Sequence, residues 1–138
     1  MREEKALELG RRLQSIKGWV PQRGMACWKG ENDAWLPGYI LVSIDETGTV
    51  EMFSPHGEHR FADRHDFRVD PRDPRVVGHA LAAVRKARGR PGLYPSCEVW
   101  PDGVIWAVYD VSASSRWFPR LEADTEIEAI ILAGEIAQ

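Results

Sequence analysis

The segment from Asp70 to Gly92, DPRDPRVVGHALAAVRKARGRPG, constrains the fold most because it carries both the start and the end signals of a helix. Asp73 can cap a helix whose first position is Pro74, where no backbone N–H is needed. Basic residues in the last turn oppose the negative end of the helix dipole, and Gly89 and Pro91 end the helix. The positions at helical spacing on one face are apolar: Val77, Ala80, Leu81 and Val84. We therefore expect a core helix over about 74–88.

Two further helices and two hairpins are expected around it. Residues 2–17 show an amphipathic pattern, and Thr125 and Glu128 have the spacing of a capping box before a broadly apolar last helix. Residues 39–45 and 49–54 flank a turn, as do 93–100 and 104–111, which predicts two β-hairpins. Residues 18–28 read as a short edge strand, and 29–38 are rich in turn formers. The order predicts one α+β domain over 1–138, with a mainly antiparallel sheet and about three helices packed on one side.

Composition excludes several classes of protein. The chain has 138 residues, 43% hydrophobic, with six tryptophans, which argues against intrinsic disorder. No run of eighteen apolar residues is present, so no membrane span is expected. The first residues lack the apolar run of a signal peptide, which indicates a cytoplasmic protein whose two cysteines are reduced.

Charge alternates in blocks along the chain. Residues 1–30 carry seven basic and three acidic side chains, whereas 31–59 carry six acidic and no Lys or Arg. Residues 60–90 are again basic, and 91–138 are acidic. The blocks could neutralise one another, or the basic ones could gather on one face and bind nucleic acid. The residues that would contact phosphate are Arg11, Arg12, Arg85, Lys86, Arg88 and Arg90.

A polar, histidine-rich stretch over about 54–73 is expected to be a long connection. Its imidazoles and carboxylates have the donor chemistry of a zinc site, and the candidate ligands are His56, His59, Asp63 and His65. The stretch lacks the HExxH spacing, and two arginines among the candidates would repel a cation. A metal-dependent enzyme and a solvated polar loop are therefore both open.

Tryptophans form the remaining distinctive set. Aromatic side chains usually pair across strands and fill a core. Trp35, Trp117 and Phe118 lie in loop-like contexts and are the aromatic residues most expected to be exposed, where they could bind a protein. Base stacking with single-stranded nucleic acid is the other use of an exposed aromatic patch.

Signatures of catalysis are missing elsewhere. Cys27 and Cys97 have apolar neighbours and read as buried, inert thiols, and the serines of SASSR lack the G-x-S-x-G turn. Neither a P-loop nor a dinucleotide fingerprint is present. We therefore expect no cofactor, and a binding protein rather than an enzyme.

Three stretches resemble a group of small proteins of tailed bacteriophages and prophages from GC-rich bacteria. They are LGRRLQSIKGWVPQRGM, DPRDPRVVGHALAAVRKARGRP and ADTEIEAIILAGEIA, about 55 residues in all. Their motifs are capping and core patterns, so the resemblance implies no catalytic residue. It implies an accessory protein in the bacterial host's cytoplasm that binds a host or phage protein. Self-association through the apolar C-terminal helix is a further expectation, and residues 31–69 are longer than the group's pattern.

Overall fold

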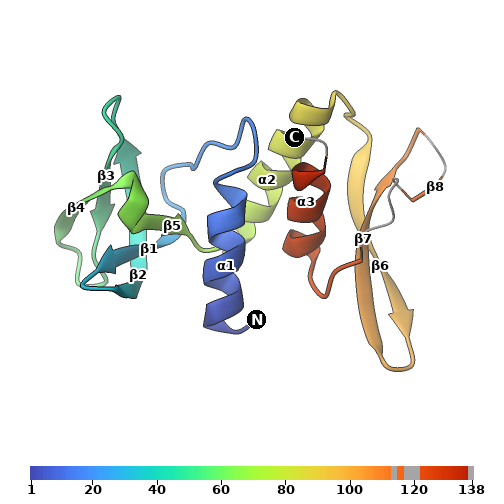
Figure 1. The fold of residues 1–138 in the computed structure, drawn as a ribbon, viewed down its shortest axis with the longest axis horizontal. Coiled ribbons are helices and arrows are strands. Elements are labelled where there is room, and N and C mark those ends of the chain that lie inside the picture. Colours follow the sequence, from blue (N-terminus) through green and yellow to red (C-terminus); the bar gives the residue numbers. More distant parts are fainter. Residues whose placement is uncertain (113–114, 117–121, 137–138) are drawn as a thin grey trace. The chain divides into compact units, whose positions relative to one another are not determined.

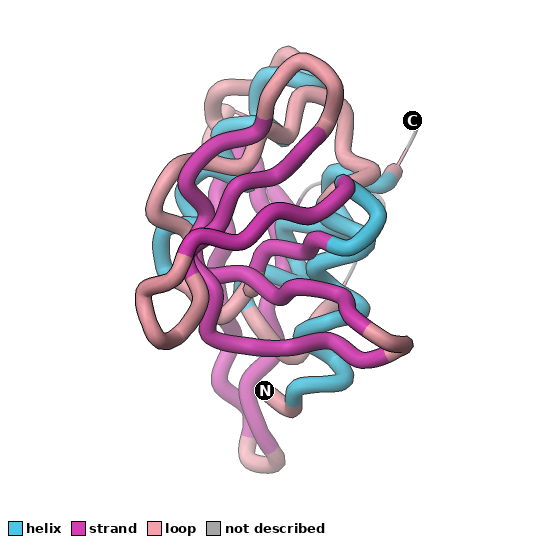
Figure 2. Tube along the Cα trace, turned by 90° about the vertical axis from the view of Figure 1, so that its left-hand side faces the viewer, coloured by secondary structure: helices cyan, strands magenta, loops and turns pink. Residues whose placement is uncertain are grey.

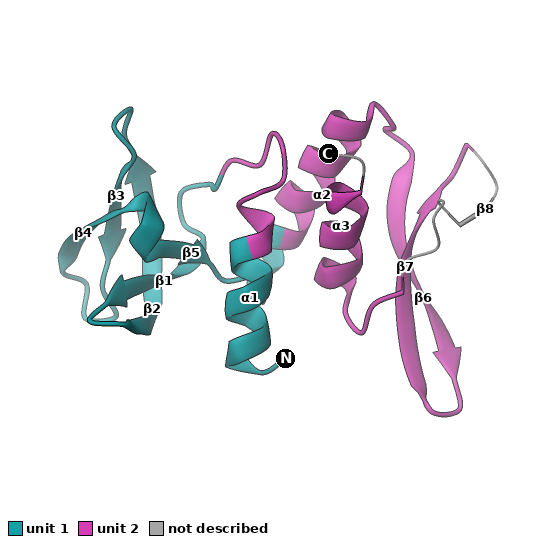
Figure 3. Ribbon diagram, in the orientation of Figure 1, with its two compact units in different colours: residues 1–11, 21–76 teal, residues 12–20, 77–138 magenta. Residues whose placement is uncertain are grey.

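The structure, a computed structural model, describes residues 1–112, 115–116 and 122–136. Its described helices and strands are labelled in Figure 1, and the strands form two antiparallel sheets (Figure 2). The chain consists of two compact units (Figure 3). The first unit comprises residues 1–11 and 21–76, and the second comprises 12–20 and 77–138. We expected one domain over 1–138; helices α1 (Glu3–Leu13) and α2 (Pro74–Arg88) contribute residues to both units.

Five strands make up the sheet of the first unit. They are β1 (Ala26–Glu31), β2 (Ala34–Ile44), β3 (Thr49–Phe53), β4 (His59–Asp63) and β5 (Phe67–Val69). Their order is β4-β3-β2-β1-β5, and a 3₁₀ turn, η1 (Arg64–Asp66), precedes the last strand. The sheet is a meander whose fifth strand returns to pair with the first. A fold by itself implies no function.

The first hairpin of this sheet was missed from sequence. Asn32 (φ 51°) and Asp33 (φ 62°) are both left-handed, as a two-residue type I′ turn requires, and Glu31 pairs with Ala34 across it. The stretch 29–38 is therefore largely strand rather than turn. The edge position expected for 18–28 is also wrong, because β1 lies between β2 and β5, and Pro21 and Gly24 precede it.

The second hairpin, β2–β3, confirms its prediction. Asp45 accepts hydrogen bonds from the backbone N–H of Thr47 (2.9 Å) and Thr49 (3.0 Å) and from the Thr47 hydroxyl (2.6 Å). These bonds, the Thr47 hydroxyl first, lower the pKa of Asp45 below its ordinary value. A carboxylate thus closes the turn.

The stretch 54–73 is not a long connection. It contains β4, η1 and β5, and β4 pairs with β3 along its whole length. β4 is an edge strand whose residues are mostly exposed, so it lacks the alternation of apolar and polar residues that marks a half-buried strand. A strand stabilised by backbone pairing at an edge leaves little signal in its sequence.

Helix α1 packs against the β1–β5 end of this sheet. The backbones approach so closely at Gly10 that an added Cβ would lie 2.5 Å from the carbonyl oxygen of Val69. Trp28 is fully buried and its Nε1 donates to Glu3 Oε1 (3.3 Å), while Arg68 donates to the Leu7 carbonyl (3.2 Å). The core beneath is apolar; its large buried side chains include Met25, Trp28, Leu41, Val50, Met52, Phe67 and Val69.

The second unit contains a three-stranded sheet with the order β6-β7-β8. Its strands are β6 (Leu93–Trp100), β7 (Gly103–Asp110) and the short β8 (Ser115–Arg116). Helix α3 (Glu126–Glu135) packs against β6 and β7 (Figure 1), and the Thr125 hydroxyl accepts from the Glu128 N–H (3.4 Å) as the capping box predicted. The apolar stripe of α3 is buried within the unit at Ile127, Ile130 and Ile131. Those residues therefore offer no surface for the expected self-association.

The predicted α+β class, with three helices and antiparallel strands, is confirmed. The strands form two sheets rather than one. Hairpins are specified locally by their turns, whereas the pairing of one hairpin with another depends on long-range packing. No helix in the described part of the chain is long and apolar enough to cross a membrane.

Asp73 joins the start of α2 to β1. Its Oδ1 accepts from the Arg75 N–H (3.0 Å), the capping bond predicted from sequence. Its Oδ2 accepts from the Ala26 N–H (2.8 Å), the first residue of β1. Asp73 is buried, and both bonds are partly shielded from water.

Replacing Asp73 with alanine should destabilise the fold by about 2–3 kcal/mol. The change removes a helix cap and leaves the half-buried Ala26 N–H without its acceptor. The free energy of unfolding from urea titration measures the loss. Glu46→Ala, which removes an exposed carboxylate of the same unit, should cost less than about 0.5 kcal/mol; equal losses would contradict the assignment.

Candidate protein-binding surfaces

The basic end of α2 holds the second unit together. Arg85 Nε donates to the Leu93 carbonyl (2.7 Å), and the Arg88 guanidinium donates to the Ala133 carbonyl (2.9 and 3.2 Å). Arg90 Nη1 donates to Asp110 Oδ2 (3.1 Å). The last carbonyls of a helix lack intrahelical partners, and Arg88 satisfies one of them in α3. These three cations therefore have structural partners.

Two of the three other residues of the predicted nucleic-acid site also have intramolecular partners. Arg11 pairs with Glu8 in α1, and Arg12 Nε lies 3.0 Å from Glu135 Oε2 in the second unit. Lys86 is exposed. Five of the six predicted phosphate contacts thus have an intramolecular acceptor, and a phosphate would have to compete with it. The geometry adds no support to the nucleic-acid interpretation.

The predicted metal ligands do not come together. His56 lies in the turn after β3, and His65 lies in η1. His59 and Asp63 are at opposite ends of β4, about 13 Å apart along a strand. His59 Nδ1 instead lies 2.8 Å from Glu51 Oε1. Among the described residues, no three His, Cys, Asp or Glu side chains are placed to hold a metal ion, so this ligand set is wrong.

The two cysteines differ. Cys27 is buried in β1, and desolvation, with a smaller contribution from the charge of Asp70, raises the pKa of its thiol to about 12. Such a thiol is inert, as expected. Cys97 was expected to be buried as well, but it is exposed on β6, because the strand extends beyond the core.

Iodoacetamide at pH 8 should alkylate one thiol of the native protein, at Cys97. Only the thiolate reacts, and Cys27 is protonated at this pH. Intact mass and peptide mapping report the site, and both thiols should react in urea. Labelling of native Cys27 at a rate like that of Cys97 would contradict its burial.

Asp110 is the buried carboxylate of the second unit. Besides Arg90, it accepts from the Ser112 hydroxyl (2.6 Å) and the Ser112 N–H (3.0 Å). These bonds, the Ser112 hydroxyl first, lower the pKa of Asp110. The residue holds the end of β7 through these bonds.

Asp110→Asn should lower the melting temperature at pH 7 by a few degrees, and the difference should shrink as the pH falls below 4. A carboxylate whose pKa is lower in the folded than in the unfolded protein stabilises the fold at pH values above its unfolded-state pKa. This stabilisation is lost as the pH falls and the carboxylate is protonated. Calorimetry between pH 3 and 7 measures this. A difference independent of pH would show that the carboxylate's charge contributes nothing.

Tryptophans divide between core and surface. Trp19 and Trp28 are buried, which confirms the core interpretation for them. Trp35 and Trp106 are half-buried, and Trp100 is exposed. The predicted contacts Trp117 and Phe118 lie outside the described residues.

Exposed large apolar residues concentrate on the β6–β7 hairpin. Val99 is 81% exposed, and its cross-strand partner Val104 is 44% exposed. Trp100, at the turn, is 48% exposed. We call these three residues the hairpin tip (Figure 1, lower end of β6 and β7). The sequence carried a signal that was overlooked: apolar neighbours at 99–100 and 104–105 point to both faces of a strand, and a two-stranded arm cannot bury both.

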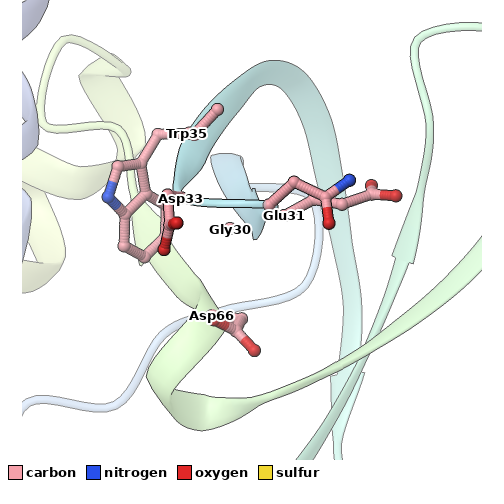
Figure 4. Close-up of a pocket in the computed structure, with 7 residues that line it drawn as sticks. Gly30, Glu31, Asp33, Trp35 and Asp66 are labelled. Carbon is pink, nitrogen blue, oxygen red and sulfur yellow. The ribbon is translucent and has the colours of Figure 1, made fainter.

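A second candidate surface surrounds Trp35 in the first unit. A hollow of about 640 Å³ is lined by both sides of the β1–β2 turn and by η1. In Figure 4, Trp35 lies on one side of Gly30 and Glu31 on the other, with Asp66 facing them from η1. Asp33 was missed from sequence, because it lies 33 positions before Asp66 and only the closure of β5 onto β1 brings the two into one hollow.

No family model matches the chain, and no curated protein or solved structure matches it significantly. The two surfaces are therefore the basis for a functional proposal.

Proposed function

We propose that this chain is a non-catalytic module that binds another protein through the hairpin tip. The observation that carries the proposal is the exposure of Val99, Trp100 and Val104 together at the end of one hairpin. Isolated exposed apolar residues are ordinary, whereas a contiguous group on a projecting element is typical of an interface.

The energetics suit a binding site. Burying a valine side chain contributes about 1.5 kcal/mol or more, and tryptophan is the residue most enriched among binding hot spots. Among the described strands, β6 pairs with β7 alone. The outer edge of β6 could therefore also pair with a strand of the partner. Such pairing would use the residues after Pro95, because proline has no N–H to donate near the start of β6.

The resemblance to phage and prophage proteins supports a partner from the phage or its bacterial host, and with it a cytoplasmic setting. The role would be that of an accessory protein. It needs no cofactor, since binding is the activity.

Val99→Asp should abolish capture of the partner. A carboxylate at the centre of an apolar interface costs about 2 kcal/mol or more, which is at least about thirtyfold in affinity. The measurement is recovery of bound protein from nuclease-treated host lysate, quantified by mass spectrometry against wild type. Trp100→Ala should reduce recovery in the same way.

Val20→Asp is the matched control, since Val20 is exposed and lies outside the hairpin tip. It should retain full recovery. Unchanged recovery with Val99→Asp, or equal loss with Val20→Asp, would rule out the hairpin tip as the binding surface. Melting temperatures of all three variants should match wild type, because the substituted side chains are largely exposed.

A further inference from the structure

A groove crosses the first unit beside Trp35. The hollow at the β1–β2 turn adjoins a second one of about 330 Å³, and the two share Gly30 and Asp66. We call the combined feature the Gly30 groove. The residues that line it include Glu31, Asp33, Trp35, Phe61, Asp63 and Asp66.

The floor of the groove depends on the missing side chain of Gly30. A Cβ there would lie 3.1 Å from Asp66 Oδ1 and 3.3 Å from Trp35 Cζ3. The carboxylate and the ring edge therefore both close on the same point of the backbone. Because Gly30 has no side chain, Asp66 and Trp35 can approach its backbone closely, and the role of glycine here is this close approach rather than an unusual backbone angle.

Two aromatic side chains give the groove apolar surface. Trp35 is held in place by Arg68, whose guanidinium carbon lies 4.3 Å from the ring centroid and which also donates to the Leu7 carbonyl. Phe61 on β4 lines the adjoining hollow and is 62% exposed. Trp35 is thus held in place by Arg68, whereas Phe61 is exposed and available to cover a ligand.

Charge in the groove is strongly one-sided. Four carboxylates line it, against the ammonium of Lys29 and the Arg68 guanidinium that lies on the Trp35 ring. Lys29 Nζ lies 3.3 Å from Glu31 Oε2. Within the described residues, no cation pairs with the three remaining carboxylates, at Asp33, Asp63 and Asp66. A concave surface lined by one sign of charge concentrates oppositely charged ligands.

We propose that the Gly30 groove binds an arginine-bearing segment of a partner protein. A guanidinium donates in two parallel bonds to carboxylates and stacks on aromatic rings, and the groove offers both kinds of group. An ammonium makes neither contact as well. Phosphate and nucleic acid are repelled by the same carboxylates.

This surface is separate from the hairpin tip. All of its residues belong to the first unit, whereas the hairpin tip belongs to the second. Binding at one surface can therefore fail without affecting the other, and synthetic peptides test the groove without the unidentified partner.

The experiment is a fluorescence anisotropy titration of the full chain into a labelled peptide, GRGRGRG, at 50 mM salt. The lysine and glutamate versions of the peptide are titrated in parallel. We expect saturable binding of the arginine peptide, binding of the lysine peptide at least about threefold weaker, and no binding of the glutamate peptide.

Asp33→Asn and Asp66→Asn together should weaken arginine-peptide binding by about tenfold or more, since each removes a charge-assisted hydrogen bond. Asparagine keeps the left-handed turn position of Asp33, so the hairpin is preserved. Phe61→Ala should weaken binding by about threefold or more through a different contact. Glu46→Gln, which removes an exposed carboxylate outside the groove, should change affinity less than about twofold.

Loss of affinity confined to the groove variants would establish the site. The proposal is overturned if the arginine peptide fails to bind at 50 mM salt, or if the lysine peptide binds equally well. It is also overturned if Glu46→Gln weakens binding as much as the double variant, which would indicate only net charge. Unchanged melting temperatures of the variants ensure that a loss reflects the groove rather than unfolding.

Discussion

The paired hydrogen bonds of Asp73 are the constraint on which the first unit depends. One carboxylate satisfies both the first turn of α2 and the first backbone N–H of β1. β1 lies between β2 and β5, so its position fixes the pairing on both sides. The same end of the sheet receives α1 through the contacts of Trp28 and Arg68. The same carboxylate therefore both caps α2 and holds the start of β1.

Arginine has three uses in this chain that sequence alone does not separate. Arg88 satisfies a carbonyl at the end of α3, Arg90 joins Asp110, and Arg68 stacks on Trp35. Each of these guanidiniums has its charge or its donors engaged by the fold. A basic segment such as 85–90 resembles a phosphate-binding patch in sequence, but here its arginines donate hydrogen bonds to two backbone carbonyls and one carboxylate. The carboxylates of Asp33, Asp63 and Asp66 have no such partner among the described residues, and they form the more open charged surface.

Sequence reasoning succeeded where the signal was local. The limits of α2, the capping by Asp73 and Thr125, and the β2–β3 and β6–β7 hairpins follow from residues within one turn of one another. It failed for β4, since an exposed edge strand shows no alternation, and for the pairing of β1 with β5, because Trp28 and its partner Arg68 are 40 residues apart. The candidate sites followed the same division. Trp35 was expected to be exposed in a loop but is half-buried in β2, and the exposure of Phe61 and Val99 became evident only in the fold.

The sequence by itself determined the α+β class, the three helices and two of the hairpins, because caps, turns and helical periodicity act over a few residues. Tertiary structure decided that the strands form two sheets, that α2's arginines face carbonyls and carboxylates, and that the histidines lie apart along β4 and η1. It also decided which apolar and acidic residues remain exposed. The physical reason is that burial and strand pairing depend on contacts between segments distant in sequence. Those contacts decide whether a given side chain is engaged within the fold or exposed and able to bind a partner.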